Sequence, residues 1–188
     1  MTRDLESFLS QYVSLSSQEV GTIASKFQRK YFRKGDFLLK EGQVCKDFVF
    51  VETGCLRLFY ESNETEISVW FAFANSSAIE IASFISGKPS EYSIQAIEDT
   101  SVLFLPKKNL EGLYASHPQA QELMRRFWED VILHLIRRFT ALQKESAETR
   151  YINLMKNTDY LHKIPQKYLA SFLGVTPTSL SRIRRKVK

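Results

Sequence analysis

The stretch from Gln166 to Lys186, QKYLASFLGVTPTSLSRIRRK, constrains the fold of this chain more than any other. Leu169, Ala170 and Leu173 fall at i, i+1 and i+4, which places them on one face of a short helix. Gly174 follows where that helix has to stop, because glycine enters the left-handed conformation without a Cβ clash. The spacing therefore predicts a helix with one buried face, followed at once by a tight turn.

A second helix is predicted to begin at Pro177. Thr176 carries the hydroxyl that an N-cap position favours, and proline fits the first helical position because no backbone N–H is needed there. Leu180 and Ile183, at i and i+3, form the inward face. The small side chain of Ala170 lets two helices cross closely after a short turn. The stretch is therefore predicted to be a helix-turn-helix.

Positive charge is concentrated in the same part of the chain. The 188 residues include 26 Lys and Arg and 21 Asp and Glu, yet residues 161–188 contain seven basic residues and no acidic one. The first 160 residues are therefore slightly acidic. The seven are Lys163, Lys167, Arg182, Arg184, Arg185, Lys186 and Lys188. Because cations on the exposed side of a helix can neutralise phosphates, we predict double-stranded DNA as a partner.

Major-groove recognition by the helix Pro177 to Lys186 is the predicted mechanism. Base edges are expected to be read by Thr178, Ser181 and Arg182, and Arg182 can contact guanine through two hydrogen bonds. The expected phosphate contacts, which set register without reading sequence, are Lys167, Thr176, Ser179, Arg185 and Lys186. Two alternatives stay open: a core helical hairpin with a solvated basic tail, and a membrane-surface helix, which the Thr and Ser residues disfavour.

From about residue 31 to residue 105 the pattern changes to that of short β-strands. Turn-forming residues recur at intervals of roughly seven to twelve residues, the spacing of successive strands in a sandwich or barrel. Strand-like runs lie at 48–51, 56–60, 67–73 and 102–105. Apolar residues at helical spacing within 5–13 and 20–27 predict two short helices before them. The expected result is a small antiparallel β-roll or jelly roll with flanking helices.

A long helix is predicted between Leu123 and Leu142. Its apolar residues cover roughly 200° of a helical wheel, about twice the stripe that a one-sided helix needs. One side can pack on the β-roll and the other on a second copy of the chain, through a parallel seam near Trp128, Val131, Leu135 and Leu142. The alternative is a helix buried within its own subunit. We therefore predict a homodimer that is held by this helix.

The predicted fold class is α+β: an N-terminal antiparallel β-roll, a long dimerisation helix and an all-α C-terminal helix-turn-helix. The polar residues Lys144 to Ser146 predict a hinge after the long helix, before a further helix at 147–156. The domains are accordingly expected at 1–116 for the β-roll with its N-terminal helices, 117–145 for the dimerisation helix and hinge, and 146–188 for the helix-turn-helix.

Other classes of function lack their residue patterns in this sequence. Cys45 and Cys55 have neither CxxC spacing nor a histidine cluster beside them, so we expect no metal site, iron–sulfur cluster, cofactor or disulfide framework. There is no nucleophile–base pair or Gly-rich phosphate loop, so we do not expect an enzyme. Acids and serines occupy the N-terminus where a signal peptide needs an apolar core, and no stretch approaches the length of a membrane span. A cytoplasmic location without a membrane partner is expected.

The order of these elements resembles the Crp/Fnr family of bacterial transcription regulators over essentially the whole chain. The most specific segments are LASFLGVTPTSLSRIRR at 169–185 and SAIEIASFISGKPSEYSIQAIED at 77–99. The resemblance implies a cyclic-nucleotide-binding-like β-roll, a homodimer that binds two-fold-symmetric promoter sites, and contact with RNA polymerase. It also places Arg182 where the family has a base-contacting arginine. The β-hairpin wing common in the family is expected to be absent, because the chain stops soon after the second helix.

The segment 77–99 is similar to the family's effector cradle, which runs from a Gly-Glu pair to an arginine that holds a cyclic-nucleotide phosphate. Here Ile79 stands at the glycine position, Glu80 keeps the acid, and Ser90 stands at the arginine position. The missing arginine removes a charge-assisted hydrogen bond of about 1.5 to 3 kcal/mol. The cradle is therefore expected to be degenerate, and the candidate effector pocket comprises Ile79, Glu80, Ile81, Ser90 and Glu91.

Cyclic AMP is therefore not expected in the family's usual pose, and no other small-molecule effector is assigned. Glu91, beside Ser90, would repel a phosphate. Glu80 also has a simpler interpretation, because an acid at the start of a short helix commonly complements the helix dipole. The alternative function is a cyclic-nucleotide-type sensor module that acts through a protein partner; salt-insensitive or absent DNA binding would favour it.

Overall fold

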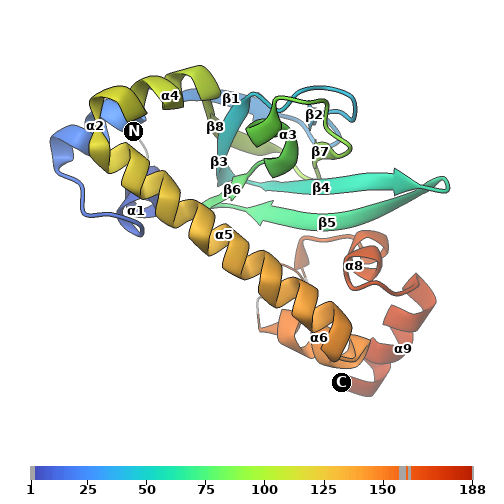
Figure 1. Ribbon diagram of the computed structural model, residues 1–188. Helices are drawn as coiled ribbons and strands as arrows, with labels where there is room; N and C mark the ends of the chain where they lie inside the picture. Colours follow the sequence, from blue (N-terminus) through green and yellow to red (C-terminus); the bar gives the residue numbers. More distant parts are fainter. Residues whose placement is uncertain (1–2, 157–159, 161, 188) are drawn as a thin grey trace. The chain divides into compact units, whose positions relative to one another are not determined.

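The computed structural model describes residues 3–156, 160 and 162–187 (Figure 1). By their contacts the residues form two compact units. The roll unit comprises residues 1–58 and 71–130, and the C-terminal unit comprises residues 59–70 and 131–188. Lys188, one of the basic residues of the C-terminal stretch, lies outside the described residues. The division into three domains at 1–116, 117–145 and 146–188 stays a prediction.

Two short helices open the roll unit, where the apolar spacing predicted them. They are α1 (Arg3–Ser10) and α2 (Ser17–Ala24). The polar break between them ends in a capping box, because Ser16 Oγ accepts from the backbone N–H of Glu19 at 3.3 Å and the Glu19 carboxylate accepts from Ser16 N at 2.8 Å. The cap gives α2 a defined start, and its buried residues Val20 and Ile23 face the core.

Within the described residues, eight strands form two four-stranded sheets, in the orders β1-β8-β3-β6 and β2-β7-β4-β5. The pairs β1–β8, β3–β8 and β3–β6 of the first sheet, and β2–β7 of the second, are antiparallel. The predicted β-roll is confirmed. The four predicted runs fall within β3, β4, β5 and β8, and the pattern missed β1, β2, β6 and β7. The strands are β1 (Gln28–Phe32), β2 (Phe37–Leu39), β3 (Asp47–Thr53), β4 (Cys55–Ser62), β5 (Thr65–Phe73), β6 (Ser76–Ala78), β7 (Ser93–Ala96) and β8 (Thr100–Pro106).

The core of the roll unit lies between the strands and is almost closed to water. Phe50 and Val51 on β3 and Leu56 on β4 are at most 1% exposed. Burial of such side chains contributes roughly 1.5 to 3 kcal/mol each. The turn from β3 to β4 requires glycine: Gly54 has φ +90°, and an added Cβ would lie 2.6 Å from the Asp99 carbonyl oxygen. Position 54, which connects the two sheets, therefore has room only for glycine.

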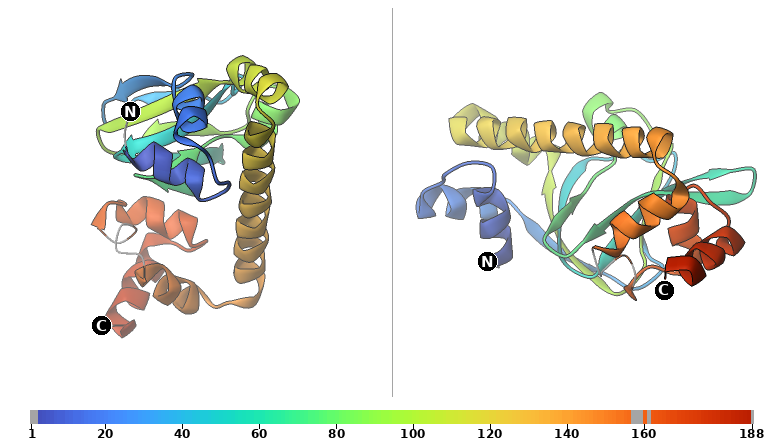
Figure 2. Two further views of the ribbon diagram at one scale, coloured as in Figure 1. Left: turned by 90° about the vertical axis from the view of Figure 1, so that its left-hand side faces the viewer. Right: turned by 90° about the horizontal axis from the view of Figure 1, so that it is seen from below.

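Three further helices complete the roll unit: α3 (Ile81–Ser86), α4 (Lys107–Ser116) and the first turns of α5 (Pro118–Lys144). Figure 2 shows α5 as one long uninterrupted helix. Phe127 on α5 packs edge-on against Phe8 and Phe48, with ring centroids 6.2 and 5.2 Å away. One side of the predicted long helix therefore does pack on the β-roll.

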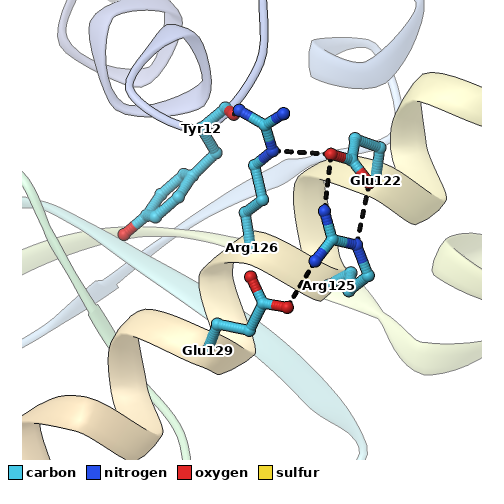
Figure 3. Close-up of polar contacts among 5 residues, drawn as sticks. All are labelled: Tyr12, Glu122, Arg125, Arg126 and Glu129. Atoms are coloured by element: carbon cyan, nitrogen blue, oxygen red, sulfur yellow. Dashed lines mark hydrogen bonds and ion pairs between the residues drawn. The ribbon is translucent and has the colours of Figure 1, made fainter.

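An ion-pair network covers the outer side of these first turns of α5 (Figure 3). The Glu122 carboxylate accepts from Arg125 and from Arg126, whose Nε lies 2.6 Å away, and Arg125 also pairs with Glu129. The hydrogen bonds from Arg125 and then Arg126 lower the pKa of Glu122 to about 2. Arg126 also donates to the Tyr12 carbonyl oxygen at 3.0 Å. Arg125 and Arg126 are thus engaged within their own subunit.

The C-terminal unit contains the rest of α5, the hairpin tip at 59–70, and helices α6 (Ala147–Met155), α8 (Gln166–Phe172) and α9 (Pro177–Val187) (Figures 1 and 2). The helical backbone is interrupted at Glu145 and Ser146, where the sequence predicted a hinge. Ser146 then caps α6, because its Oγ accepts from Thr149 N at 3.1 Å. Within this unit Ser171 on α8 donates to Ser68 Oγ at 3.0 Å.

Candidate nucleic-acid interface

Helices α8 and α9 are joined by a turn with a defined hydrogen-bond pattern. Gly174 adopts φ +69°, its N–H bonds the Ser171 carbonyl, and the N–H of Val175 bonds the Ala170 carbonyl, both at 3.0 Å. This pair of bonds is the Schellman motif that ends a helix at a left-handed glycine. The predicted role of Gly174 is therefore confirmed.

The start of α9 also matches its prediction. Thr176 Oγ1 accepts from Ser179 N at 3.2 Å, and α9 begins at Pro177. Between the helices, Leu169, Ala170 and Leu180 are fully buried. Ala170 thus lies where a longer side chain would separate the helices. Ile183 is half-buried, and the pattern did not assign Phe172, which is buried as well.

The face of α9 opposite Leu180 is exposed and basic. Thr178, Arg182 and Arg185 are all exposed, and their spacing of i, i+4 and i+7 places them on one side of the helix. Ser181, the third predicted base reader, is half-buried at the edge of this face. We call Thr178, Ser181, Arg182 and Arg185 the reading face. It carries two guanidinium groups and no acid.

The other predicted phosphate contacts lie around the reading face. Lys167 is exposed at the start of α8, with Nζ 4.7 Å from the centroid of the Tyr168 ring. Thr176 and Ser179 hydrogen-bond each other through their hydroxyls at 3.0 Å. Lys186 is 70% exposed but lies 3.6 Å from the Glu148 carboxylate on α6. A phosphate at Lys186 would thus have to compete with Glu148. Phosphate contact stays a prediction for all of them.

Two arginines that the sequence analysis did not assign hold the end of α8. Arg138 on α5 donates to the Phe172 carbonyl at 3.0 Å, with its guanidinium 3.6 Å from the Phe172 ring centroid. Arg150 on α6 donates to the Leu173 carbonyl at 2.8 Å. Cations at the C-terminal carbonyls complement the helix dipole. Burial lowers the pKa of Arg138 to about 10, so it stays charged at neutral pH. For Arg138, the sequence signal was its place inside the apolar arc of the long helix.

The C-terminal half of α5 exposes apolar side chains. Leu135 and Leu142 of the predicted seam are exposed, while Trp128 and Val131 are half-buried. Ile132, Ile136 and Phe139, which the seam did not include, are more exposed, up to 62% for Phe139. The seven residues project within one continuous arc of the helix, which we call the α5 apolar face. The predicted seam runs along one edge of it.

The residues of the predicted effector cradle are hydrogen-bonded to the protein itself. Glu80 is 4% exposed and caps α3, because its carboxylate accepts from Ala82 N at 3.0 Å and Ser83 N at 2.8 Å. The amides that could meet an anion at this helix start are thereby occupied. The Ser90 hydroxyl accepts from Tyr92 N at 3.0 Å and donates to the Tyr92 carbonyl at 2.8 Å. The simpler interpretation of Glu80, as a helix cap, fits these contacts.

The remaining cradle residues add no ligand group. Ile79 and Ile81 are half-buried and Glu91 is exposed. An apolar cavity does occur in the roll unit, but it lies elsewhere, among Phe8 on α1, Phe48 on β3 and residues of α2, α4, α5 and β8. Within the described residues no group of His, Cys, Asp or Glu is arranged to hold a metal ion. Among the described helices, none combines the length and apolar character needed to cross a bilayer.

Replacing Glu80 with alanine is expected to lower the stability of the protein. The change leaves two backbone amides of α3 without their acceptor and should cost about 1 to 2 kcal/mol, or roughly 2 to 8 °C in Tm. Glu80→Gln keeps one acceptor oxygen and is the matched control, with a smaller loss. Thermal unfolding followed by circular dichroism measures both. An unchanged Tm for Glu80→Ala would show that the cap does not hold α3.

Comparison with known proteins identifies a recognised domain over the β-strands of the chain. Residues 29–117 match the family model of the cyclic nucleotide-binding domain, over just under half of the chain. Cyclic nucleotide-gated channel alpha-4 of Mus musculus and of Rattus norvegicus is 22% identical over 113 residues, which is 58% of this chain and 20% of each channel. The chain thus spans about a fifth of the length of the curated relatives that it matches.

Solved structures share the fold over most of the chain. FixK2 from Bradyrhizobium japonicum superposes with a TM-score of 0.73 at 18% identity, covering 86% of this chain and 84% of FixK2. The c-di-GMP-responsive global regulator CLP of Xanthomonas campestris superposes with a TM-score of 0.71 at 12% identity, covering 92% of this chain and 91% of CLP. The β-roll, the long helix and the C-terminal helices are therefore a shared architecture.

Proposed function

We propose that this chain is a sequence-specific, DNA-binding transcriptional regulator of the Crp/Fnr type. The observation that carries the proposal is the asymmetry of α9, which buries Leu180 completely and exposes Thr178, Arg182 and Arg185 on the other side. Together with α8 and the Schellman turn, α9 has the form of the second helix of a helix-turn-helix, the element that enters the major groove. The absence of acids from residues 161–188 suits a phosphate backbone.

The proposal includes a homodimer. The α5 apolar face exposes Ile136 and Phe139 by more than half of their surface. Contiguous apolar surface of this kind marks an interaction site, and a second copy of the same helix is the partner with a matching surface. A dimer would present one α9 per subunit, so its target is a near-palindrome with half-sites about one helical turn apart. A contact with RNA polymerase is proposed as well, and it rests only on the resemblance to the Crp/Fnr family.

Regulation by cyclic AMP in the family's usual pose is not part of the proposal. The roll unit matches a cyclic nucleotide-binding domain, but serine replaces the phosphate-binding arginine and Glu80 already occupies the amides of α3. A free phosphate would meet the exposed Glu91 instead of a cation. Adding cyclic AMP or cyclic GMP is therefore expected to leave the Tm unchanged, whereas a ligand at a hundred times its Kd would stabilise the fold by about 2.7 kcal/mol.

Selection of bound sequences from random DNA tests the proposal directly. At about 50 mM salt the chain should enrich a two-fold-symmetric motif, and its affinity should fall steeply at about 200 mM salt because bound phosphates release counterions. The enrichment should be the same with and without cyclic nucleotides. Absent or salt-insensitive DNA binding would contradict the proposal and favour a sensor module that acts through a protein partner, which the match of residues 29–117 would still accommodate.

A further inference from the structure

The side chain of Gln166 connects the start of α8 to the edge of the reading face. Its Nε2 donates to Ser181 Oγ at 2.6 Å and to the Pro177 carbonyl at 3.2 Å. Both acceptors lie on α9, and Ser181 is 15 residues further along the chain. The bonds join the first residue of α8 to the first and second turns of α9. Gln166 is half-buried and belongs to neither the predicted base readers nor the predicted phosphate contacts.

The Pro177 carbonyl determines which end of the Gln166 amide faces α9. A carbonyl oxygen can only accept, so the amide nitrogen, not the amide oxygen, has to lie against it. The same nitrogen is then the donor to Ser181, and Ser181 Oγ is the acceptor in that bond. One lone pair of Ser181 Oγ is therefore in use on the protein side, and its proton is directed elsewhere.

Within the described residues the Ser181 hydroxyl donates to no protein acceptor. Its neighbours one and three residues away are Arg182 and Thr178, both exposed on the reading face. The remaining direction for the O–H is outward, toward whatever the reading face meets. The side-chain conformation of Ser181 is thereby fixed in the free protein with the hydroxyl as a donor, so DNA binding costs no further side-chain entropy at this residue.

We propose that Gln166 is a positioning residue that sets Ser181 to read a base as a hydrogen-bond donor; this rests on the proposed function. A donor in the major groove selects the acceptors O6 and N7 of guanine, N7 of adenine or O4 of thymine, and it disfavours the amino group of cytosine. Gln166 itself touches no base. Sequence preference at one base pair of each half-site then depends on a residue outside the reading face.

Selection from random DNA with four proteins tests the inference: the wild type, Ser181→Ala, Gln166→Met and Gln166→Glu. One symmetric pair of positions should lose its preference for an acceptor base in Ser181→Ala, by roughly threefold to tenfold, the worth of one hydrogen bond. Gln166→Met has a similar length but no hydrogen-bonding group, and should lose the preference at the same pair. The rest of the motif should stay as in the wild type, and thermal unfolding checks that both variants are folded at the temperature of the selection.

Gln166→Glu separates hydrogen-bond polarity from simple loss of contact. Its carboxylate only accepts, so it should turn away from the Pro177 carbonyl and meet Ser181 alone; the Ser181 proton should then turn inward and its lone pairs outward. The preference should then move toward cytosine or adenine, whose amino groups donate. The inference is overturned if Gln166→Met keeps the wild-type preference at the position that depends on Ser181, or if Ser181→Ala alters no position. If the wild type selects no motif at all, the proposed function fails, and this inference with it.

Discussion

A chain with Phe139 replaced by glutamate is expected to be a monomer that no longer binds its operator tightly. Phe139 is 62% exposed, so the change should leave the subunit folded while placing a charge in the centre of the α5 apolar face. The wild type should sediment as twice 21.8 kDa and the variant as 21.8 kDa. Losing the second α9 should weaken operator binding by about a hundredfold to ten-thousandfold, because the two half-sites are no longer bound together.

Leu133→Glu is the matched control for this experiment. Leu133 is 50% exposed on the same helix, but it lies about 120° around the helix from Phe139. The control should remain a dimer and keep its affinity for the operator. Analytical ultracentrifugation and titration of labelled operator DNA measure both quantities. A wild type that is monomeric at micromolar concentration, or a Phe139→Glu variant that stays dimeric, would refute the proposed use of the α5 apolar face.

Replacing Arg182 with alanine is expected to remove sequence discrimination with little effect on general DNA binding. Arg182 is exposed at the middle of the reading face, where its guanidinium can reach O6 and N7 of a guanine together. The change should cost about 1 to 3 kcal/mol per half-site on the selected operator and little on random DNA. Fluorescence anisotropy with the two kinds of duplex, at equal salt, gives both affinities.

Arg185→Ala provides the contrasting control on the same face. As a predicted phosphate contact it should weaken operator and random DNA about equally and reduce the salt dependence by roughly one phosphate per subunit. If Arg182→Ala lost the same affinity on both duplexes, Arg182 would be a phosphate contact and not a base reader. The pair of variants thus assigns the two arginines to separate roles, although both are exposed cations one turn apart.

Much of the local structure followed from short patterns of residues. The glycine at 174, the cap at Thr176 and the start of α9 at Pro177 were predicted from a few neighbouring positions, and the structure confirms all three. The long helix was predicted from the period of its apolar residues. The alternative interpretation of Glu80 as a helix cap likewise needed only its place before a short helix. Caps, turns and helical periods each depend on residues within about one helical turn of one another, so short stretches of sequence predict them directly.

Short strands with little pattern of their own were harder to predict. β2 and β6 have three residues each, and most residues of β1 are exposed. No alternation of apolar and polar residues can develop over such lengths, so nothing marks them until a partner strand is present. β1 becomes a strand by pairing with β8, more than 60 residues later in the chain. Pairing at that distance decides the strand, and the local sequence does not.

The sequence by itself determined the succession of β-roll, long helix and C-terminal helices, the polarity of α9 and the apolar arc of α5, because each depends on residue type at a fixed local spacing. Only the tertiary structure decided which side chains meet across that order. It brought Arg138 and Arg150 to the carbonyl end of α8, and Gln166 to Ser181. Those contacts span 15 to 34 residues, and their partners are set by how whole helices pack, which no local period encodes.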